Sequence, residues 1–216
     1  MRMLDVSVVS DAICPWCFIG KRRLAKAAAL LLPRLKIRVS WRPFQLNPGM
    51  PPGGAPRLEY RLRKFGSLDY SRWLDQQVAT AGKSEGVAFR HDLMTRTPNT
   101  LNAHRVIWLS GREGDQDATV EAVFAAYFLE GRDIGEAATL AELAEAGGLP
   151  RRRTLALLAS DEGLAEIASE ERAFRAMGVN SVPSLIADGS IIVTGAAPPG
   201  EIASALIDAA ASRAEA

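Results

Sequence analysis

The two cysteines of the chain stand two residues apart, in the segment Cys14-Pro15-Trp16-Cys17. The apolar stretch before them, Leu4 to Val9, predicts a strand, and Lys21 to Leu32 predicts a helix. A cysteine at the start of a helix lies near unpaired backbone N–H groups and the positive end of the dipole, which favour the thiolate. Pro15 suits the first helical turn, where its missing N–H costs nothing. The spacing therefore predicts a reversible dithiol, with Cys14 as the nucleophile and Cys17 as the resolving thiol.

Other uses of a C-x-x-C motif fit the chain less well. A structural zinc site needs four ligands, and the two histidines, His91 and His104, are far away and thirteen residues apart. Covalent haem attachment needs a histidine directly after the second cysteine, where the chain has Phe18. A purely structural disulfide would close only a tiny loop and constrain little of the unfolded chain. We therefore expect no metal and no bound cofactor besides the redox-active disulfide Cys14–Cys17.

Composition narrows the class of partner and the compartment. The chain has 216 residues and a formal net charge of +1, with no basic block interleaved with aromatic residues, so we expect no nucleic acid partner. No apolar run reaches the roughly 18 residues that span a bilayer. Asp5 interrupts the first apolar residues, and Cys14 comes too early for a removable signal peptide. We expect a cytoplasmic protein, in which disulfides tend to be catalytic or transient.

The first elements must position this dithiol. Lys36 to Trp41 alternates and predicts a second strand, so the N-terminal part is a βαβ unit with a parallel strand pair. A loop rich in proline and glycine, Pro43 to Pro56, ends this unit. From Arg57 to about Met177 the pattern is helical. One helix carries an apolar stripe that predicts core packing, formed by Val120, Val123, Phe124, Tyr127 and Phe128.

The remaining elements complete the sheet. Thr139 with Glu142 predicts a capping box at a helix start. Ser184 to Ala187 and Ile191 to Thr194 read as two strands, and Asp188-Gly189 between them is a hairpin signal. A final helix is expected over Glu201 to Ala211. The order βαβ, helical block, ββα predicts an α/β protein with one mixed sheet and an excursion of helices.

Motifs along almost the whole chain carry a family resemblance. They are Asp11-x-x-Cys14-Pro15-Trp16-Cys17-x-x-Gly20-Lys21, Arg42-Pro43-Phe44-x-Leu46-Asn47-Pro48, Pro98-Asn99-Thr100 with Ala103-His104-Arg105, Tyr127-Phe128-x-x-Gly131-x-Asp133-Ile134, Val182-Pro183 and Thr194-Gly195-Ala196. The chain resembles the DsbA-like superfamily, and within it the FrnE-like branch of dithiol oxidoreductases. The resemblance implies a thioredoxin fold interrupted by a large all-helical insertion domain. We expect its N-terminal half at residues 1–50, the insertion at 51–165 and its C-terminal half at 166–216.

The resemblance also implies supporting residues around the cysteines. Val182-Pro183 is expected to form a cis peptide bond against the dithiol, with the Val182 backbone pairing with an extended substrate segment. Trp16 either forms an apolar lip beside the sulfur or packs as a surface aromatic. Asp11 either accepts the Cys17 proton or bonds its own turn.

Three further polar residues are candidate substrate contacts. Asn47 and Asn99 either hydrogen-bond a peptide or glutathione across the cleft, or stabilise their own loops. His104 either contacts substrate or is a satisfied core histidine. Their placement in the fold decides between these alternatives.

The expected function is a thiol-disulfide oxidoreductase or disulfide isomerase that acts on protein or small-molecule disulfides. The partner is glutathione or a thioredoxin-type reductant, and the net direction of the reaction stays open. One rival is a glutathione-dependent isomerase similar to the kappa-class transferases, in which a serine takes the place of Cys14. The other is a redox-sensitive peptide-binding chaperone.

Overall fold

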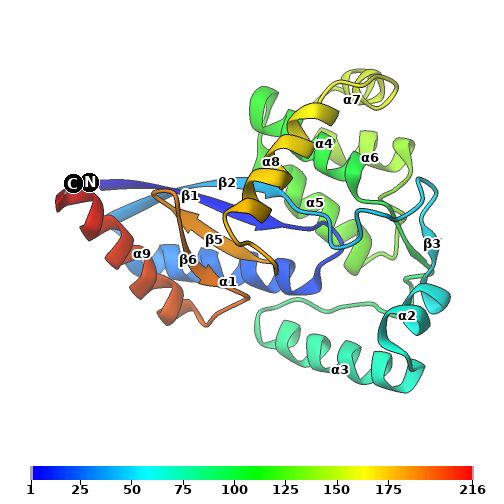
Figure 1. The fold of residues 1–216 in the computed structure, drawn as a ribbon, viewed down its shortest axis with the longest axis horizontal. Coiled ribbons are helices and arrows are strands. Elements are labelled where there is room, and N and C mark those ends of the chain that lie inside the picture. The colour runs from blue at the N-terminus through cyan, green and yellow to red at the C-terminus, as the bar shows by residue number, and fades with distance from the viewer. Residues whose placement is uncertain (1, 216) are drawn as a thin grey trace.

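The structure is a computed structural model that describes residues 2–215 (Figure 1). Its main sheet has the strand order β2-β1-β5-β6, made of β1 (Arg2–Ser10), β2 (Leu35–Pro43), β5 (Ser184–Ala187) and β6 (Ser190–Thr194). β1 pairs in parallel with β2 and antiparallel with β5, and β5 pairs antiparallel with β6. Two helices, α1 (Pro15–Leu31) and α9 (Pro199–Glu215), pack against each other beside this sheet (Figure 1). The predicted mixed sheet of a thioredoxin fold is confirmed.

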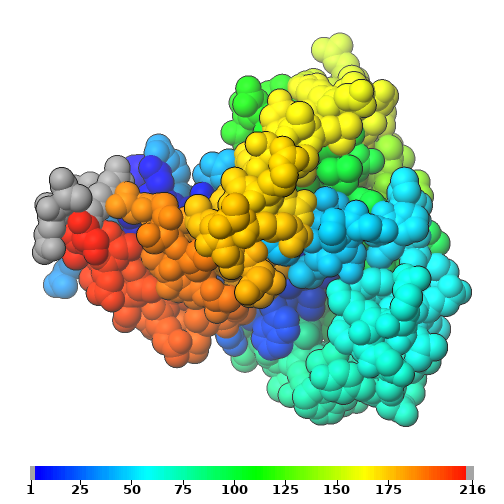
Figure 2. Space-filling view, in the orientation of Figure 1, coloured from blue at the N-terminus to red at the C-terminus, as the bar shows by residue number. Residues whose placement is uncertain are grey.

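The insertion between β2 and β5 is helical apart from one short strand pair. It comprises β3 (Ala55–Pro56), α2 (Arg57–Phe65), α3 (Leu68–Ser84), β4 (Arg96–Thr97), α4 (Leu101–Glu113), α5 (Gln116–Phe128), α6 (Ala137–Leu143), the 3-10 turn η1 (Ala144–Gly147), α7 (Arg151–Leu158) and α8 (Leu164–Ala176). β3 and β4 pair antiparallel, which closes the α2–α3 hairpin at its base. Figure 2 shows this hairpin as a cyan lobe beside the blue N-terminal part of the chain. The hairpin is thereby placed next to the start of α1.

An aromatic cluster fixes α1 against the insertion. The ring of Phe18 stacks on those of Phe124 and Phe128, at centroid distances of 5.2 and 6.1 Å, and meets the edge of Phe89 at 6.2 Å. The predicted apolar stripe of α5 is therefore core, and Phe124 and Phe128 are 2% and 1% exposed. Lys21 adds an ion pair with Asp117 of α5, 2.5 Å long. The N-terminus of α1 is held rigidly, because the residues just behind it are packed on several sides.

Two local predictions have opposite outcomes. The hairpin signal is confirmed, since Asp188 and Gly189 both have positive φ, 51° and 73°, between β5 and β6. The capping box of Thr139 and Glu142 is wrong. α6 begins at Ala137, so Thr139 lies inside the helix, and the N-cap residue Glu136 makes no side-chain capping bond.

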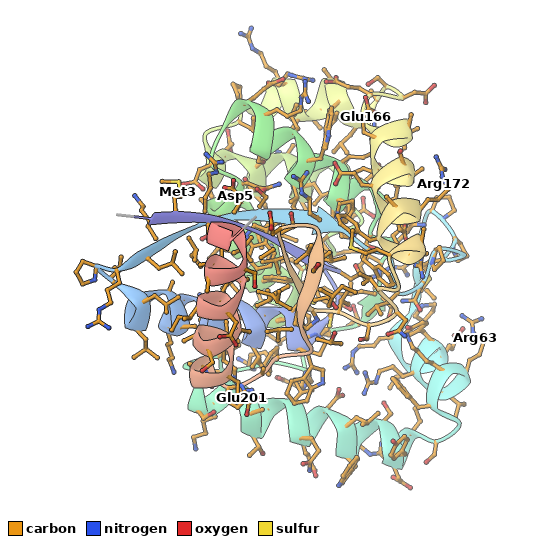
Figure 3. The ribbon with its side chains drawn as sticks, turned by 60° about the vertical axis from the view of Figure 1, so that its left-hand side comes forward. Met3, Asp5, Arg63, Glu166, Arg172 and Glu201 are labelled. Atoms are coloured by element: carbon orange, nitrogen blue, oxygen red, sulfur yellow. The ribbon has the colours of Figure 1, made fainter. Side chains whose placement is uncertain are left out.

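Many charged side chains lie on the outside of the molecule, although a few, such as Asp11 and Arg105, are buried. Figure 3 shows Asp5, Arg63, Glu166, Arg172 and Glu201 pointing away from the packed interior. Among the described residues, no helix combines the length and the apolar character needed to cross a membrane. The buried apolar residues form a cluster shared by the sheet, α1, α9 and the insertion.

Candidate active site

Cys14 occupies the N-cap position of α1. Its backbone is extended (φ −90°, ψ 111°), Pro15 is the first helical residue, and the Cys17 N–H donates to the Cys14 carbonyl at 3.0 Å. The first turn of α1 holds no acidic residue. The sulfur of Cys14 therefore lies at the positive end of a 17-residue helix, with no nearby carboxylate from that turn to oppose a thiolate.

The two sulfurs have different surroundings, although both cysteines are free thiols in this structure. Cys14 is 4% exposed and lines a pocket, whereas Cys17 is fully buried behind it. Burial raises the pKa of Cys17 well above its ordinary value of 9.0, and the hydrogen bond and negative field of Cys14 raise it further. A hydrogen bond with the Asp11 backbone lowers this pKa, while the Asp11 charge raises it. Cys17 therefore holds its proton more tightly than an exposed thiol does.

The Val182–Pro183 peptide bond is cis, as expected, and it lies against the dithiol. The Cys14 Sγ is 3.5 Å from the Val182 carbonyl oxygen. Gly20 of α1 makes room for the proline, since a Cβ at that position would lie 2.9 Å from Pro183 Cγ. The glycine of the C-x-x-C-x-x-Gly motif therefore permits the close approach of the Pro183 loop to α1.

Asp11 is completely buried beside the dithiol. Its Oδ2 accepts a hydrogen bond from the Leu46 backbone N–H at 2.8 Å, so its side chain bonds a distant loop and not its own turn. Its Oδ1 lies 3.4 Å from Nε2 of His104, and neither atom has a hydrogen-bond partner among the described residues. A buried carboxylate oxygen with no donor is placed to take up a proton.

His104 neighbours Asp11 and lines a different cavity from that of Cys14. It is 3% exposed and lines a second cavity of about 180 Å³, between β2 and α4, together with Gln116 and Glu170. The side chain is therefore buried next to Asp11, and it does not line the pocket of Cys14. Its contact with Asp11 is observed in the structure, and its contact with substrate stays a prediction.

Asn47 and Asn99 do not line the pocket of Cys14 either. The Oδ1 of Asn47 accepts from the Tyr60 hydroxyl at 2.7 Å and from Lys64 Nζ at 3.2 Å. The Nδ2 of Asn99 donates to the Met50 carbonyl at 2.6 Å, and its Oδ1 accepts from a backbone N–H of the following helix. Both side chains stabilise loops that border the site, and their predicted role in substrate binding remains a prediction.

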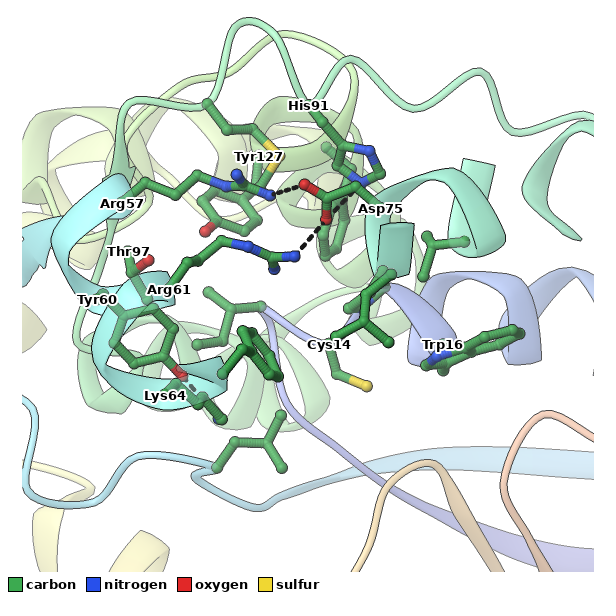
Figure 4. A pocket seen from close by; sticks show the side chains of 18 of the residues that line it. Cys14, Trp16, Arg57, Tyr60, Arg61, Lys64, Asp75, His91, Thr97 and Tyr127 are labelled. Atoms are coloured by element: carbon green, nitrogen blue, oxygen red, sulfur yellow. Dashed lines mark hydrogen bonds and ion pairs between the residues drawn. The ribbon is translucent and has the colours of Figure 1, made fainter. Parts of the chain in front are cut away.

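The pocket beside Cys14 has a volume of about 400 Å³ and is walled by the α2–α3 hairpin (Figure 4). Trp16, 39% exposed, lies at the Cys14 end and contributes an apolar face. The opposite end carries three cationic side chains of α2, from Arg57, Arg61 and Lys64. The sequence prediction omitted these cations. Their spacing of four and three residues shows that they share one face of the helix, but not that this face meets Cys14.

One partly buried carboxylate organises the cationic end. Asp75 of α3 pairs with Arg57 at 2.9 Å and with Arg61 at 2.8 Å, and His91 Nε2 lies 4.0 Å from it. Burial lowers the pKa of His91, and the two arginines lower it further against the pull of Asp75. Burial and the charge of Arg57 also lower the pKa of Arg61. His91 is therefore a neutral member of the cluster at pH 7, and the arginines carry its positive charge.

The comparison with known families identifies the family to which the chain belongs. The sequence profile of the DSBA-like thioredoxin domain matches residues 5–207. The chain belongs to this family. The pair Cys14–Cys17, the cis-Pro183 and the mixed sheet are thus the parts of a DsbA-like thioredoxin fold with a helical insertion.

Solved structures with the same fold have several described activities. A probable DsbA oxidoreductase from Streptomyces coelicolor is 29% identical and superposes with a TM-score of 0.85, over 95% of this chain and 89% of its own. A 2-hydroxychromene-2-carboxylate isomerase (18% identical, TM-score 0.72) and the cytosolic disulfide reductase DsbM from Pseudomonas aeruginosa with glutathione (19%, 0.61) each match over 98% of both chains. The last two likenesses concern the fold alone.

Proposed function

We propose that this protein is a thiol-disulfide oxidoreductase of the disulfide isomerase type, with the Cys14–Cys17 dithiol as its redox centre. The observation that carries the proposal is the position of Cys14. Cys14 is the N-cap residue of a helix, and its sulfur lines a pocket and lies 3.5 Å from the carbonyl oxygen of Val182, while Cys17 is sealed behind it. This arrangement supplies one accessible sulfur for attack and one buried sulfur for release.

The reaction proceeds in two displacements. The Cys14 thiolate attacks one sulfur of a substrate disulfide, which forms a mixed disulfide and releases the other sulfur as a thiolate. Cys17 then loses its proton and attacks the Cys14 sulfur, which releases the second substrate thiolate and leaves the Cys14–Cys17 disulfide. Two electrons pass from the protein dithiol to the substrate. In reverse, the protein disulfide oxidises substrate thiols, and release from the mixed disulfide to another substrate thiol gives isomerisation.

Two neighbouring groups support these steps. An extended segment of the substrate pairs with the backbone of Val182, beside the sulfur that it presents to Cys14. Asp11 accepts the Cys17 proton when the resolving attack begins, because it is the buried carboxylate whose charge acts on that thiol. Trp16 supplies an apolar lip to the entrance.

The cellular setting is part of the same proposal. We place the protein in the cytoplasm, with thiol and disulfide substrates and with glutathione or a thioredoxin-type reductant restoring the dithiol. No nucleic acid, membrane, metal or bound cofactor is required. The reduction potential of the Cys14–Cys17 couple sets the direction: a value near the cytosolic glutathione poise favours reduction or isomerisation, and a much higher value favours oxidation.

The decisive test replaces each sulfur in turn. The Cys17→Ser variant should accumulate mixed disulfides with a model substrate, because nothing displaces the captured thiol from Cys14. The matched Cys14→Ser variant should accumulate none, although it keeps the other cysteine. Net reduction of a protein disulfide should be lost in both variants, whereas refolding of a scrambled protein, which needs only the Cys14 mixed disulfide, should be lost in Cys14→Ser. Retention of these activities in Cys14→Ser would refute the proposal.

A glutathione-dependent isomerase is the second candidate function. The observation in its favour is the enclosed pocket of about 400 Å³, which has the size of a small-molecule site. Such an enzyme needs no resolving thiol, so Cys17→Ser would leave isomerisation of its substrate intact. Loss of turnover together with a trapped mixed disulfide argues for the oxidoreductase.

A further inference from the structure

The side chains that line the pocket carry a net positive charge. Three permanent cations, Arg57, Arg61 and Lys64, line it together with a single carboxylate, Asp75. Asp75 offsets only one of them, so the pocket holds an excess of two positive charges. A low-polarity enclosure strengthens such a field, which attracts an anionic group.

The cations keep donors that the protein does not use. Arg57 gives one nitrogen to Asp75, and Arg61 spends its Nε and Nη2 on Ser71 and Asp75. Within the described part of the chain, neither guanidinium has a buried nitrogen that lacks a hydrogen-bond partner. Both side chains line the cavity, and we take their remaining N–H groups as available to a ligand there. A guanidinium presents its N–H groups as a planar fork that matches a carboxylate.

Most of the remaining pocket surface is apolar. Its walls carry Leu46, Phe65, Leu74, Val78, Met94 and Phe128. Figure 4 shows the Cys14 sulfur and the Trp16 ring at one end and the cationic side chains at the other. A volume of about 400 Å³ lies at the lower end of the range for small-molecule sites, so it encloses a small molecule better than a folded protein loop.

We propose that the pocket selects small-molecule thiols and disulfides with an apolar body and a carboxylate at the end remote from sulfur. The carboxylate binds Arg61, Arg57 and Lys64, the body packs between the α2–α3 hairpin and Trp16, and the sulfur meets Cys14. This inference rests on the proposed function, whose substrate class it narrows. Glutathione shares the anionic charge but lacks the apolar body, and it serves as a comparison.

The chemistry on such a substrate needs no further reactant. Cys14 attacks one sulfur of the anionic disulfide and releases one thiolate, and Cys17 displaces the second thiolate from Cys14. The substrate disulfide gains two electrons and becomes two thiols, while the protein dithiol becomes a disulfide. Arg61, Arg57 and Lys64 contact the substrate only through its carboxylate, so they affect which substrate binds and not the disulfide exchange itself.

The test compares an anionic and a neutral aromatic disulfide. Reduced protein is mixed with dithiobis(nitrobenzoate) or with dithiodipyridine, and each rate constant is divided by the rate constant of dithiothreitol with the same reagent. This normalisation corrects for the different intrinsic reactivities of the two reagents, which have different leaving groups. The ratio of the two normalised values is the selectivity for the anion, and it also cancels any change in the reactivity of Cys14. Glutathione disulfide is assayed in the same way.

Arg61→Gln should lower this selectivity about tenfold, since a hydrogen bond to a charged group contributes on that order. Lys64→Gln, which alters an exposed side chain and leaves the Asp75 cluster intact, should lower it about threefold. Arg61→Lys should restore part of the loss. The control Arg72→Gln removes the same charge from α3 at a residue outside the pocket, and it should change the selectivity less than twofold.

The outcomes separate the two proposals. A selectivity that stays unchanged in both Arg61→Gln and Lys64→Gln, or that falls equally in Arg72→Gln, overturns the substrate assignment. Equal selectivity for glutathione disulfide and the aromatic anion also overturns it, because the apolar walls would then contribute nothing. Failure of the wild-type protein to react with either reagent faster than dithiothreitol refutes the proposed function itself.

Discussion

The buried thiol of Cys17 should make the stability of the reduced protein fall as pH rises above the ordinary thiol range. Burial raises the pKa of Cys17 well above 9.0 in the folded protein. In the unfolded chain the pKa of a cysteine is about 8.5. Between these two values the unfolded state has lost the proton and the native state still binds it. The free energy of unfolding therefore decreases with rising pH in this window.

The loss of unfolding free energy can be calculated from the titration of one group, the Cys17 thiol. Below about pH 8 both states hold the proton, and the stability contributed by the buried neutral thiol is fully present. Above the unfolded pKa the loss approaches about 1.4 kcal/mol per pH unit. Between pH 7.5 and 9.5 it integrates to about 1.4 kcal/mol, a large share of the stability of a marginally stable domain.

Urea unfolding of the fully reduced protein at pH 7.5, 8.5 and 9.5 measures this loss. The matched control is Cys17→Ala, since Cys14 is present in both proteins and the difference between their pH slopes isolates position 17. Burial also raises the pKa of Tyr127, and its small contribution to the pH slope is the same in both proteins, so it cancels in the difference. Equal pH slopes in the wild-type protein and the variant would show that Cys17 titrates normally, and the asymmetry between the two sulfurs would be lost.

Three substitutions test other contacts. Gly20→Ala pushes a Cβ against the ring of Pro183 and should cost about 1–3 kcal/mol in urea unfolding, with a matching fall in the rate of disulfide reduction. Arg105→Ala removes the buried guanidinium that donates to the carbonyls of Leu157, Ser160 and Glu162, and should cost roughly 3 kcal/mol by the same measurement. Phe124→Ala removes the ring stacked on Phe18 and should lower the unfolding free energy by about 3–5 kcal/mol. An unchanged urea midpoint in any of these variants contradicts the packing described for it.

The fold could be predicted wherever the signal is local. Three local features depend on a few neighbouring residues and are found in the structure as expected. They are the helix start at the cysteine pair, Pro15 at the first helical position and the Asp188-Gly189 turn. The capping box failed for the opposite reason. Glu142 pairs at 2.9 Å with Arg132, in the loop before the helix, and so it does not reach back to a cap. A tertiary ion pair outcompeted the local motif.

The site was harder to predict because its cations come from a distant helix. A row such as Arg57, Arg61 and Lys64 on one helix face usually meets solvent, and the sequence alone gives no reason to expect otherwise. What turns this face toward Cys14 is the pairing of β3 with β4, together with the bond from the Arg57 N–H to the Thr95 carbonyl at 2.9 Å. These are long-range contacts without a local signature.

The two sulfurs illustrate how one motif obtains two chemical roles. Cys14 faces a pocket with an excess of positive charge and the N-terminus of α1, both of which favour an anion. Cys17 lies one turn further in, where burial, Cys14 and the Asp11 charge all raise its pKa. The Asp11 charge therefore opposes loss of the Cys17 proton to solvent. In the proposed mechanism, the bond from Cys14 to substrate removes the charge and the hydrogen bond of Cys14 that raise the Cys17 pKa, so capture of the substrate would itself prepare the second attack.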